Sequence, residues 1–128
     1  MKVRHIEAVF EDERGAIEDI LENEQFEHAT IIRSRAGAVR GNHYHERTWQ
    51  WVFVLSGSIR YVVGLPSGET DSGVIRPNDL LLTEPMESHA LETLEETVFL
   101  VLTRGPRGGT GYEDDTFRLE EPLIPISA

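Results

Sequence analysis

The 128-residue chain contains no cysteine, which excludes disulfides, thiolate metal sites and cysteine nucleophiles. In a chain of this size the absence suits a reducing compartment, so we expect a cytoplasmic protein. No stretch approaches the roughly 20 apolar residues of a membrane helix, and the N-terminus has no signal-peptide core, so we expect no membrane partner. The length fits one domain over residues 1–128, because a second would need about 100 residues of its own.

Lysine is almost absent as well, since eleven of the twelve basic residues are arginine. The net charge of −11 argues against a nucleic-acid partner. Residues 1–30 hold nine acids and three bases (−6), residues 31–83 four and six (+2), and residues 84–128 ten and three (−7). Arginine offers a planar fork for phosphate or carboxylate. The basic middle therefore admits an anionic small molecule, with a compositional preference for arginine as the alternative explanation.

Helical periodicity is scarce, and short segments of alternating apolar and polar residues dominate. Turns rich in Gly, Pro, Asn and Asp bound these segments, a pattern typical of an antiparallel β-sandwich or barrel. Only residues 16–25 could form a short helix, and a strand followed by a turn fits them equally well. The expected strands span residues 3–9, 29–35, 49–55, 58–65, 79–83, 89–94 and 97–103.

The last quarter of the chain differs from this pattern. Residues 105–111 (GPRGGTG) are predicted to be flexible because glycine and proline dominate them. Residues 112–128 are predicted to form a C-terminal arm, either a terminal strand or a segment that docks on a neighbouring subunit.

The segment 49–55 carries an aromatic face. Alternation places Trp49, Trp51, Phe53 and Leu55 on one side and Gln50 on the other. If Gln50 faces the interior, the aromatic side forms an exposed apolar patch of the kind that marks an interface, unless the N-terminal strands cover it. We therefore expect a homodimer.

Three of the five histidines form a pattern. His43 and His45 lie two residues apart in RGNHYH, so on a strand they share a face, and each neutral ring offers a nitrogen for a metal or a proton. His89 opens another predicted strand. His5 and His28 lie in predicted N-terminal strands outside this pattern and are expected to be surface or packing residues.

The order G-N-H-Y-H-x4-Q-x6-G, followed by P-N-D and P-x3-H, resembles the two sequence motifs of the cupin superfamily. The resemblance covers about residues 35–103 and implies an all-β, antiparallel, double-stranded β-helix, or jelly-roll barrel. In metal-binding cupins two His and a Glu of the first motif and a His of the second hold the ion. Transferred residue by residue, the implied metal ligands are His43, His45, Gln50 and His89.

Gln50 is the departure from that pattern, since the family usually has Glu there. A neutral amide oxygen binds a divalent cation less well than a carboxylate, so a metal would bind more weakly. Three His still suffice for an ion such as Zn, Fe, Mn or Ni with an open position. The alternatives are His side chains that act without metal, and His side chains that are only hydrogen-bonded inside the barrel.

The segment from Arg40 to His45 narrows the resemblance. It is similar to nucleotide-sugar cupins, the 4-keto-hexose 3,5-epimerases and 3,4-ketoisomerases, and to the cupin domain of bifunctional capsule-sugar enzymes. The HxH-x4-Gln variant is similar to the ketoisomerases, in which these His work as acid and base without metal. DERG at residues 12–15 and the YEDDTFR tail at 112–118 agree with this. The resemblance implies an enzyme of polysaccharide biosynthesis, a nucleotide-sugar isomerase or epimerase.

Such an enzyme must remove a proton next to a carbonyl and return one to a neighbouring atom. His43 and His45 are the candidate base and acid, with Tyr44 or Tyr61 as a second proton donor. A bound metal would polarise the carbonyl. The candidate phosphate-binding arginines are Arg33, Arg35, Arg40, Arg60 and Arg76, of which Arg40 lies beside the His pair; Trp49, next to Gln50, is a candidate for the barrel mouth.

Two other functions stay open on the sequence. One is a metal-dependent enzyme of another kind, such as a small dioxygenase with Fe(II) on His43, His45 and His89. The other is a ligand-binding barrel without turnover, because a fold alone does not fix a function.

Overall fold

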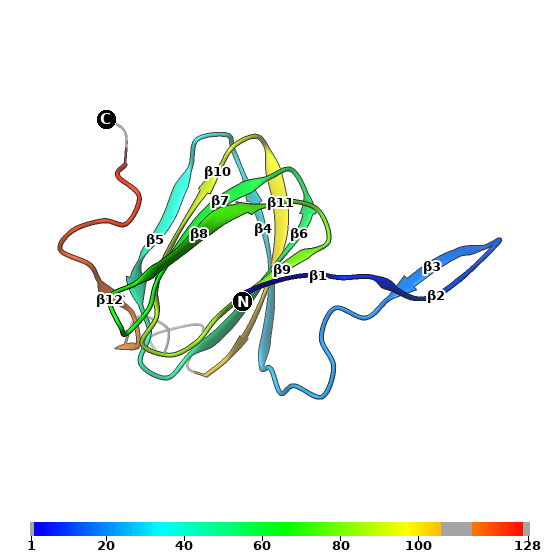
Figure 1. Cartoon of the computed structure of the whole chain (residues 1–128), viewed down its shortest axis with the longest axis horizontal. Coiled ribbons are helices and arrows are strands. Elements are labelled where there is room, and N and C mark those ends of the chain that lie inside the picture. The colour runs from blue at the N-terminus through cyan, green and yellow to red at the C-terminus, as the bar shows by residue number, and fades with distance from the viewer. Residues whose placement is uncertain (1, 106–113, 127–128) are drawn as a thin grey trace.

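The structure is a computed structural model, and it describes residues 2–105 and 114–126. The regular secondary structure of these described residues is almost entirely β-strand (Figure 1). Their bounds are β1 (Val3–His5), β2 (Ala8–Asp12), β3 (Gly15–Glu18), β4 (His28–Ser34), β5 (Val39–Tyr44), β6 (Trp49–Ser56), β7 (Ile59–Gly64), β8 (Thr70–Ile75), β9 (Asp79–Thr83), β10 (Ser88–Thr93), β11 (Thr97–Arg104) and β12 (Phe117–Arg118).

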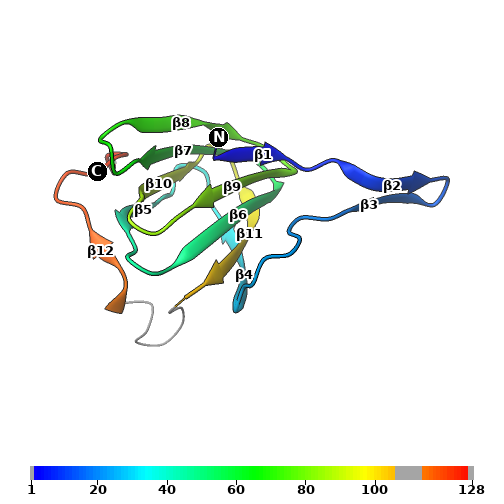
Figure 2. The same ribbon diagram turned by 60° about the horizontal axis from the view of Figure 1, so that its bottom comes forward.

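Two five-stranded antiparallel sheets face each other and form the barrel (Figure 2). One has the order β1-β9-β6-β11-β4 and the other β12-β5-β10-β7-β8. The core between them is made of alternate side chains of β6, β7, β9, β10 and β11, because successive residues of a strand point to opposite faces. Phe99, Ile59 and Leu81 in this core are fully buried. The antiparallel jelly-roll predicted from the sequence is confirmed.

Most strand predictions are confirmed, with three differences. The segment predicted as one strand over residues 3–9 divides into β1 and the start of β2. Residues 16–25 contain strand β3 and no described helix, so the strand-and-turn alternative holds there. Strands β5 and β8 were not predicted. The sequence of β8, TDSGVI, has no apolar alternation, and β5 contains the turn-forming pair Gly41 and Asn42.

The pair Gly41 and Asn42 forms a β-bulge inside β5. Consecutive residues His89 and Ala90 of β10 pair with His43 and Gly41, which leaves Asn42 as the extra residue. Gly41 and Asn42 both have positive φ angles, 90° and 58°. Gly41 and Asn42 therefore do adopt the backbone conformation of turn residues, but they form a bulge within the strand and do not end it.

The aromatic face of β6 points outward and is covered within the same chain. Trp51 and Phe53 are each 4% exposed, and they pack with Ile6 and with Ile20 and Leu21 from the segment that follows β3. The exposed patch from which we expected a dimer is thus absent among the described residues.

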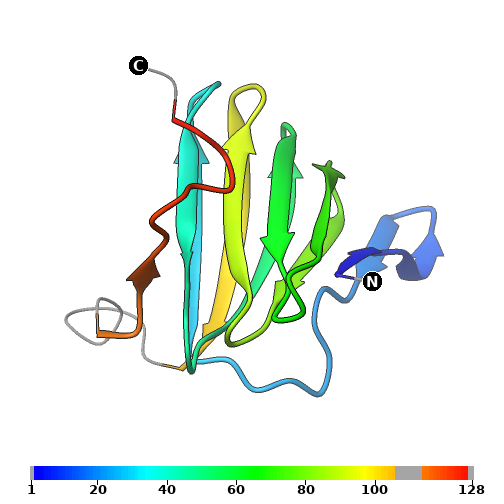
Figure 3. The same ribbon diagram turned by 60° about the vertical axis from the view of Figure 1, so that its left-hand side comes forward.

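The N-terminal hairpin and the C-terminal segment lie at opposite ends of the molecule. Hairpin β2–β3 projects away from the barrel (Figure 1). Residues 114–126 run beside β5, as the orange and red trace of Figure 3 shows, and β12 pairs with β5 of the same chain. Residues 106–111 of the predicted flexible segment, and residues 112–113 and 127–128 of the arm, lie outside the described residues. No described segment forms a helix long and apolar enough to cross a membrane.

Candidate functional site

Three buried histidines meet inside the barrel. His43 and His45 come from β5 and its end, and His89 comes from β10. The ring of His43 lies 4.8 Å from that of His45 and 4.8 Å from that of His89, measured between centroids, and His45 lies 5.4 Å from His89. The candidate ligand atoms of the three rings all lie within 4.8 Å of one another. The cluster expected from the sequence is therefore assembled.

The bulge at Asn42 sets this geometry. Because it adds one residue to β5, His43 comes directly opposite His89. The bulged Asn42 is held in place by its own side chain, which donates to the carbonyl of Ile124 at 2.9 Å and accepts from the Ile124 N–H at 3.1 Å. The C-terminal segment thus fastens the strand that carries two of the histidines.

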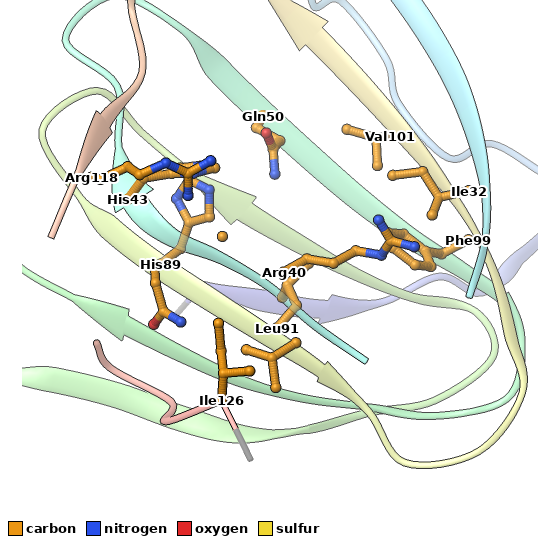
Figure 4. A pocket seen from close by; sticks show the side chains of 13 residues that line it. Ile32, Arg40, His43, Gln50, His89, Leu91, Phe99, Val101, Arg118 and Ile126 are labelled. Atoms are coloured by element: carbon orange, nitrogen blue, oxygen red, sulfur yellow. The ribbon is translucent and has the colours of Figure 1, made fainter. Parts of the chain in front are cut away.

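A cavity of about 420 Å³ opens beside the cluster. His43, His89 and Gln50 line it together (Figure 4). Gln50 therefore faces the interior. On an unbroken strand a residue five positions after His45 would point to the opposite face, so the turn between β5 and β6 resets the register. His45 is 2% exposed and is not among the residues that line the cavity. The other lining residues are Ile32, Val39, Arg40, Gly41, Asn42, Leu91, Phe99, Val101, Arg118 and Ile126.

Burial keeps His89 uncharged. Desolvation, together with the charges that His43 and His45 would carry, lowers the pKa of His89 to about 3. His45 has a fixed partner for one nitrogen, because its Nδ1 lies 2.8 Å from the main-chain carbonyl oxygen of Asp115. A carbonyl can only accept, so Nδ1 carries the proton of the neutral ring and the lone pair is on Nε2.

The donor set fits a divalent metal ion. His89 is neutral, and its candidate ligand atom lies within 4.8 Å of those of His43 and His45. Imidazole nitrogens suit Zn, Fe, Cu and Ni. His43, His45 and His89 would hold the ion, with the Gln50 amide on the same cavity wall.

Two arginines face the cavity and no described acidic residue lines it. Arg40, predicted from its place beside the His pair, donates from Nε to the Ser34 hydroxyl at 3.3 Å. Arg118 comes from β12, where it pairs with His43 in the sheet, and Figure 4 places its side chain beside His43. No function was assigned to Arg118 from the sequence, although Arg118 lies in the YEDDTFR tail that agreed with the resemblance to the ketoisomerases.

The other candidates lie away from this cavity. The Tyr61 hydroxyl points to Asp71, 3.4 Å away, and the ring belongs to the core. Arg60 forms an ion pair with Glu92 at 3.0 Å. The structure therefore does not bring Tyr61 or Arg60 to the histidine cluster.

Two aromatic candidates also have other partners. Trp49 lies in an outer groove, where the guanidinium of Arg104 stacks 4.7 Å from its ring centre. Tyr44 stacks on Phe117 of the C-terminal segment, at 5.2 Å between ring centroids. Neither is among the residues that line the histidine cavity.

Comparison with known proteins agrees with this architecture. The profile of one protein family, the polysaccharide biosynthesis C-terminal domain, matches residues 10–65. A search of curated protein sequences finds no match.

Solved structures are similar over most of the chain. A 3,4-ketoisomerase from Thermoanaerobacterium thermosaccharolyticum in complex with TDP is 23% identical, with a TM-score of 0.72 over 92% of this chain and 88% of the other. A 3,4-ketoisomerase from Helicobacter canadensis is 22% identical, with a TM-score of 0.74 over 91% and 89%. An epimerase from Mycobacterium tuberculosis is 18% identical, with a TM-score of 0.74 over 89% and 66%. The chain therefore has the cupin barrel fold that these two ketoisomerases and this epimerase share.

Proposed function

We propose that the protein is a nucleotide-sugar isomerase or epimerase that transfers a proton next to the keto group of a nucleotide-linked 4-keto-hexose. One observation carries the proposal: buried histidines line a cavity whose only charged residues, in the described part of the chain, are Arg40 and Arg118. Titratable groups for proton transfer thus lie beside cations for a diphosphate. A neighbour of this fold has been determined with TDP-4-keto-6-deoxyglucose, which supports this substrate class.

The proton transfer is assigned first to His43. It lines the cavity, and its imidazole can remove the proton from the carbon next to the carbonyl and return it, on the same face, to the former carbonyl carbon. The former carbonyl oxygen gains a proton and the neighbouring hydroxyl loses one, so the keto group moves by one carbon. Epimerisation would instead need a proton returned to the same carbon from the opposite face. His89 is a weak base because burial lowers its pKa to about 3. The Gln50 amide can donate to the carbonyl oxygen as negative charge develops there, a task that a carboxylate could not perform.

The two arginines are assigned to the nucleotide diphosphate. Guanidinium groups bind phosphate oxygens in pairs, and Arg40 and Arg118 lie on neighbouring strands, β5 and β12, at this cavity. The cavity volume of about 420 Å³ lies within the usual range for small-molecule sites, about 300–1,000 Å³.

The experiment follows hydrogen exchange. Purified protein is incubated with TDP-4-keto-6-deoxyglucose in D₂O, and loss of the proton signals next to the keto group is followed by NMR. We expect exchange with the natural chain and with Arg60→Ala, whose arginine lies outside the cavity, and none above background with His43→Asn. A substrate that binds with full occupancy but never exchanges would overturn the proposal and favour a binding barrel.

A metal-dependent enzyme is the second candidate, favoured by the three-histidine cluster. When bound, the ion would polarise a carbonyl or activate a small ligand. Elemental analysis of protein purified without chelator decides between the two. A stoichiometric Zn, Fe, Mn or Ni content that activity requires would favour this reading, whereas exchange by metal-free protein would support the acid–base isomerase.

We also propose that the chain is a homodimer, on a basis other than the aromatic face. An isolated two-stranded hairpin is marginally stable in water, and in β2–β3 Phe10 and Ile17 are 52% and 57% exposed. We expect a second copy of the chain to cover this hairpin. The hairpin is strongly acidic, and the free edge strand β4 exposes Ile31 next to Arg33, so the two surfaces are complementary in charge and both carry exposed apolar side chains.

Light scattering after size exclusion tests the dimer. We expect twice the chain mass, reduced to one chain in Phe10→Asp/Ile17→Asp but not in Leu94→Asp, an exposed apolar control. A natural chain that stays monomeric at micromolar concentration contradicts the proposal.

A cytoplasmic location is proposed on the absence of cysteine.

A further inference from the structure

Asp115 lies at the centre of a dense set of hydrogen bonds next to the histidine cluster. The residue is 1% exposed. Its carboxylate accepts from the main-chain N–H groups of Glu46 at 3.0 Å, Arg47 at 3.1 Å and Thr48 at 3.0 Å, and from the Thr48 hydroxyl at 2.7 Å. These donors belong to the short turn between β5 and β6.

The buried carboxylate is well stabilised as an anion. Burial alone would raise its pKa, but the hydrogen bonds from Thr48, Arg47 and Glu46 outweigh it and hold the pKa of Asp115 below the usual value. The Arg47 side chain contributes little, since its Nε is 3.8 Å away and the side chain is 66% exposed. The turn is therefore organised by four directed donors around one charge.

The main chain of Asp115 makes a second contact that reaches the site. Its carbonyl oxygen accepts from Nδ1 of His45 at 2.8 Å. In water the two tautomers of a neutral imidazole are close in energy, so one hydrogen bond to a pure acceptor decides which nitrogen is protonated. Through this bond, the Nε2 lone pair of His45 is kept for the interior of the cluster.

We propose that Asp115 is the positioning residue of this site, because its carboxylate fixes the β5–β6 turn while its carbonyl fixes the tautomer of His45. The catalytic consequence rests on the proposed isomerase function. The positioning itself does not, because it concerns only His45 and the turn. The arrangement joins the two strands that supply His43 and Gln50 at one buried anion.

The location of Asp115 gives it this capacity. It lies at the start of the described C-terminal segment, one residue after Asp114, and the Asn42 side chain holds the far end of that segment at Ile124. Between these two anchors lies Arg118, at the cavity. A segment held at both ends forms a fixed wall of the site, so the tail is part of the active site and not only its cover.

The test compares Asp115→Asn with Asp114→Asn, which removes the same charge from an exposed neighbour. Imidazole ¹⁵N NMR reads the tautomer of His45 directly, without any substrate. We expect a single tautomer protonated on Nδ1 in the natural chain and in Asp114→Asn, and a mixture in Asp115→Asn. Asp115→Asn keeps the main-chain carbonyl that contacts His45 but weakens the carboxylate contacts that hold it in place. We expect kcat to fall about 10–100-fold, the usual loss when the outer support of a functional histidine is disturbed, while KM stays within about twofold.

Thr48→Val keeps the charge and removes one of the four donors, so it covers the case in which Asp115→Asn does not fold. We expect an intermediate tautomer mixture and an intermediate kcat, with Thr48→Ser close to the natural chain. The proposal is overturned if His45 in the natural chain is protonated on Nε2. It is also overturned if the folded variants lose thermal stability but keep the tautomer and kcat. An inactive natural chain with the expected tautomers would refute only the isomerase function.

Discussion

Gly41→Ala is the substitution that most directly tests how the bulge shapes the site. Gly41 has a φ of +90°, a conformation that costs a residue with a side chain roughly 1–2 kcal/mol. An added Cβ would lie 2.8 Å from the carbonyl oxygen of His89 and 3.2 Å from the Cα of Ala90. Both are main-chain atoms that cannot rotate away, and such overpacking costs about 1–3 kcal/mol. The free energy of unfolding should fall by about 2–5 kcal/mol.

Gly68→Ala separates the two contributions. Gly68 has nearly the same φ, +93°, but a Cβ there would meet nothing within 4 Å, so it should lose only about 1–2 kcal/mol. Urea unfolding of both variants measures the difference, and titration with TDP tests the site. We expect weaker TDP binding in Gly41→Ala alone, because His89 must shift with its strand. Equal losses of stability in the two variants, within about 0.5 kcal/mol, would refute the packing argument.

Three further predictions concern charge at the site. Arg40→Ala or Arg118→Ala should each weaken TDP binding about 10–100-fold in calorimetry, the value of a charged hydrogen bond, whereas Arg60→Ala should not. In metal-free protein the free energy of unfolding should not depend on His89 above pH 6.5. Below that pH it should fall by up to about 1.4 kcal/mol per pH unit until the pH reaches the pKa of His89, about 3, because only the unfolded state then binds the proton. His89→Gln should flatten this slope in urea titrations. Gln50→Glu should tighten Zn binding in calorimetry and slow hydrogen exchange, and tighter Zn with unchanged exchange would contradict the donor assignment.

The sequence predicted the barrel well because its information is local. Strands β6, β7, β9 and β11 are short segments rich in β-branched, aromatic and leucine residues, and each is bounded by turn residues, so fold and strand position follow from the pattern alone. The prediction failed at β5, where Gly41 and Asn42 indicate a turn. The pairing of β5 with β10 overrides that local preference and turns the pair into a bulge.

The site was predictable only where one motif supplies it. His43, His45, Gln50 and Arg40 stand within eleven residues, and the structure gathers them at the cluster and its cavity. The prediction for Tyr61 could not be made from its own segment, because a strand has two faces and packing against distant core residues decides which face Tyr61 occupies. Asp115 lies in the YEDDTFR tail that agrees with the resemblance to the ketoisomerases, but its partners are about 70 residues away, so the sequence alone could not predict which groups it contacts.

The net charge of −11 says little about the ligand, because the molecule separates its charges. The net-basic middle of the sequence supplies Arg40, as its composition indicated, but the second cavity arginine, Arg118, comes from the most acidic third of the chain. Acidic side chains contribute nothing to the described cavity wall. In a low-dielectric cleft the charges that line the wall determine the local electrostatic potential more than the net charge of the molecule does. A diphosphate would therefore meet two cations at this cavity, whereas a cationic ligand would gain nothing there.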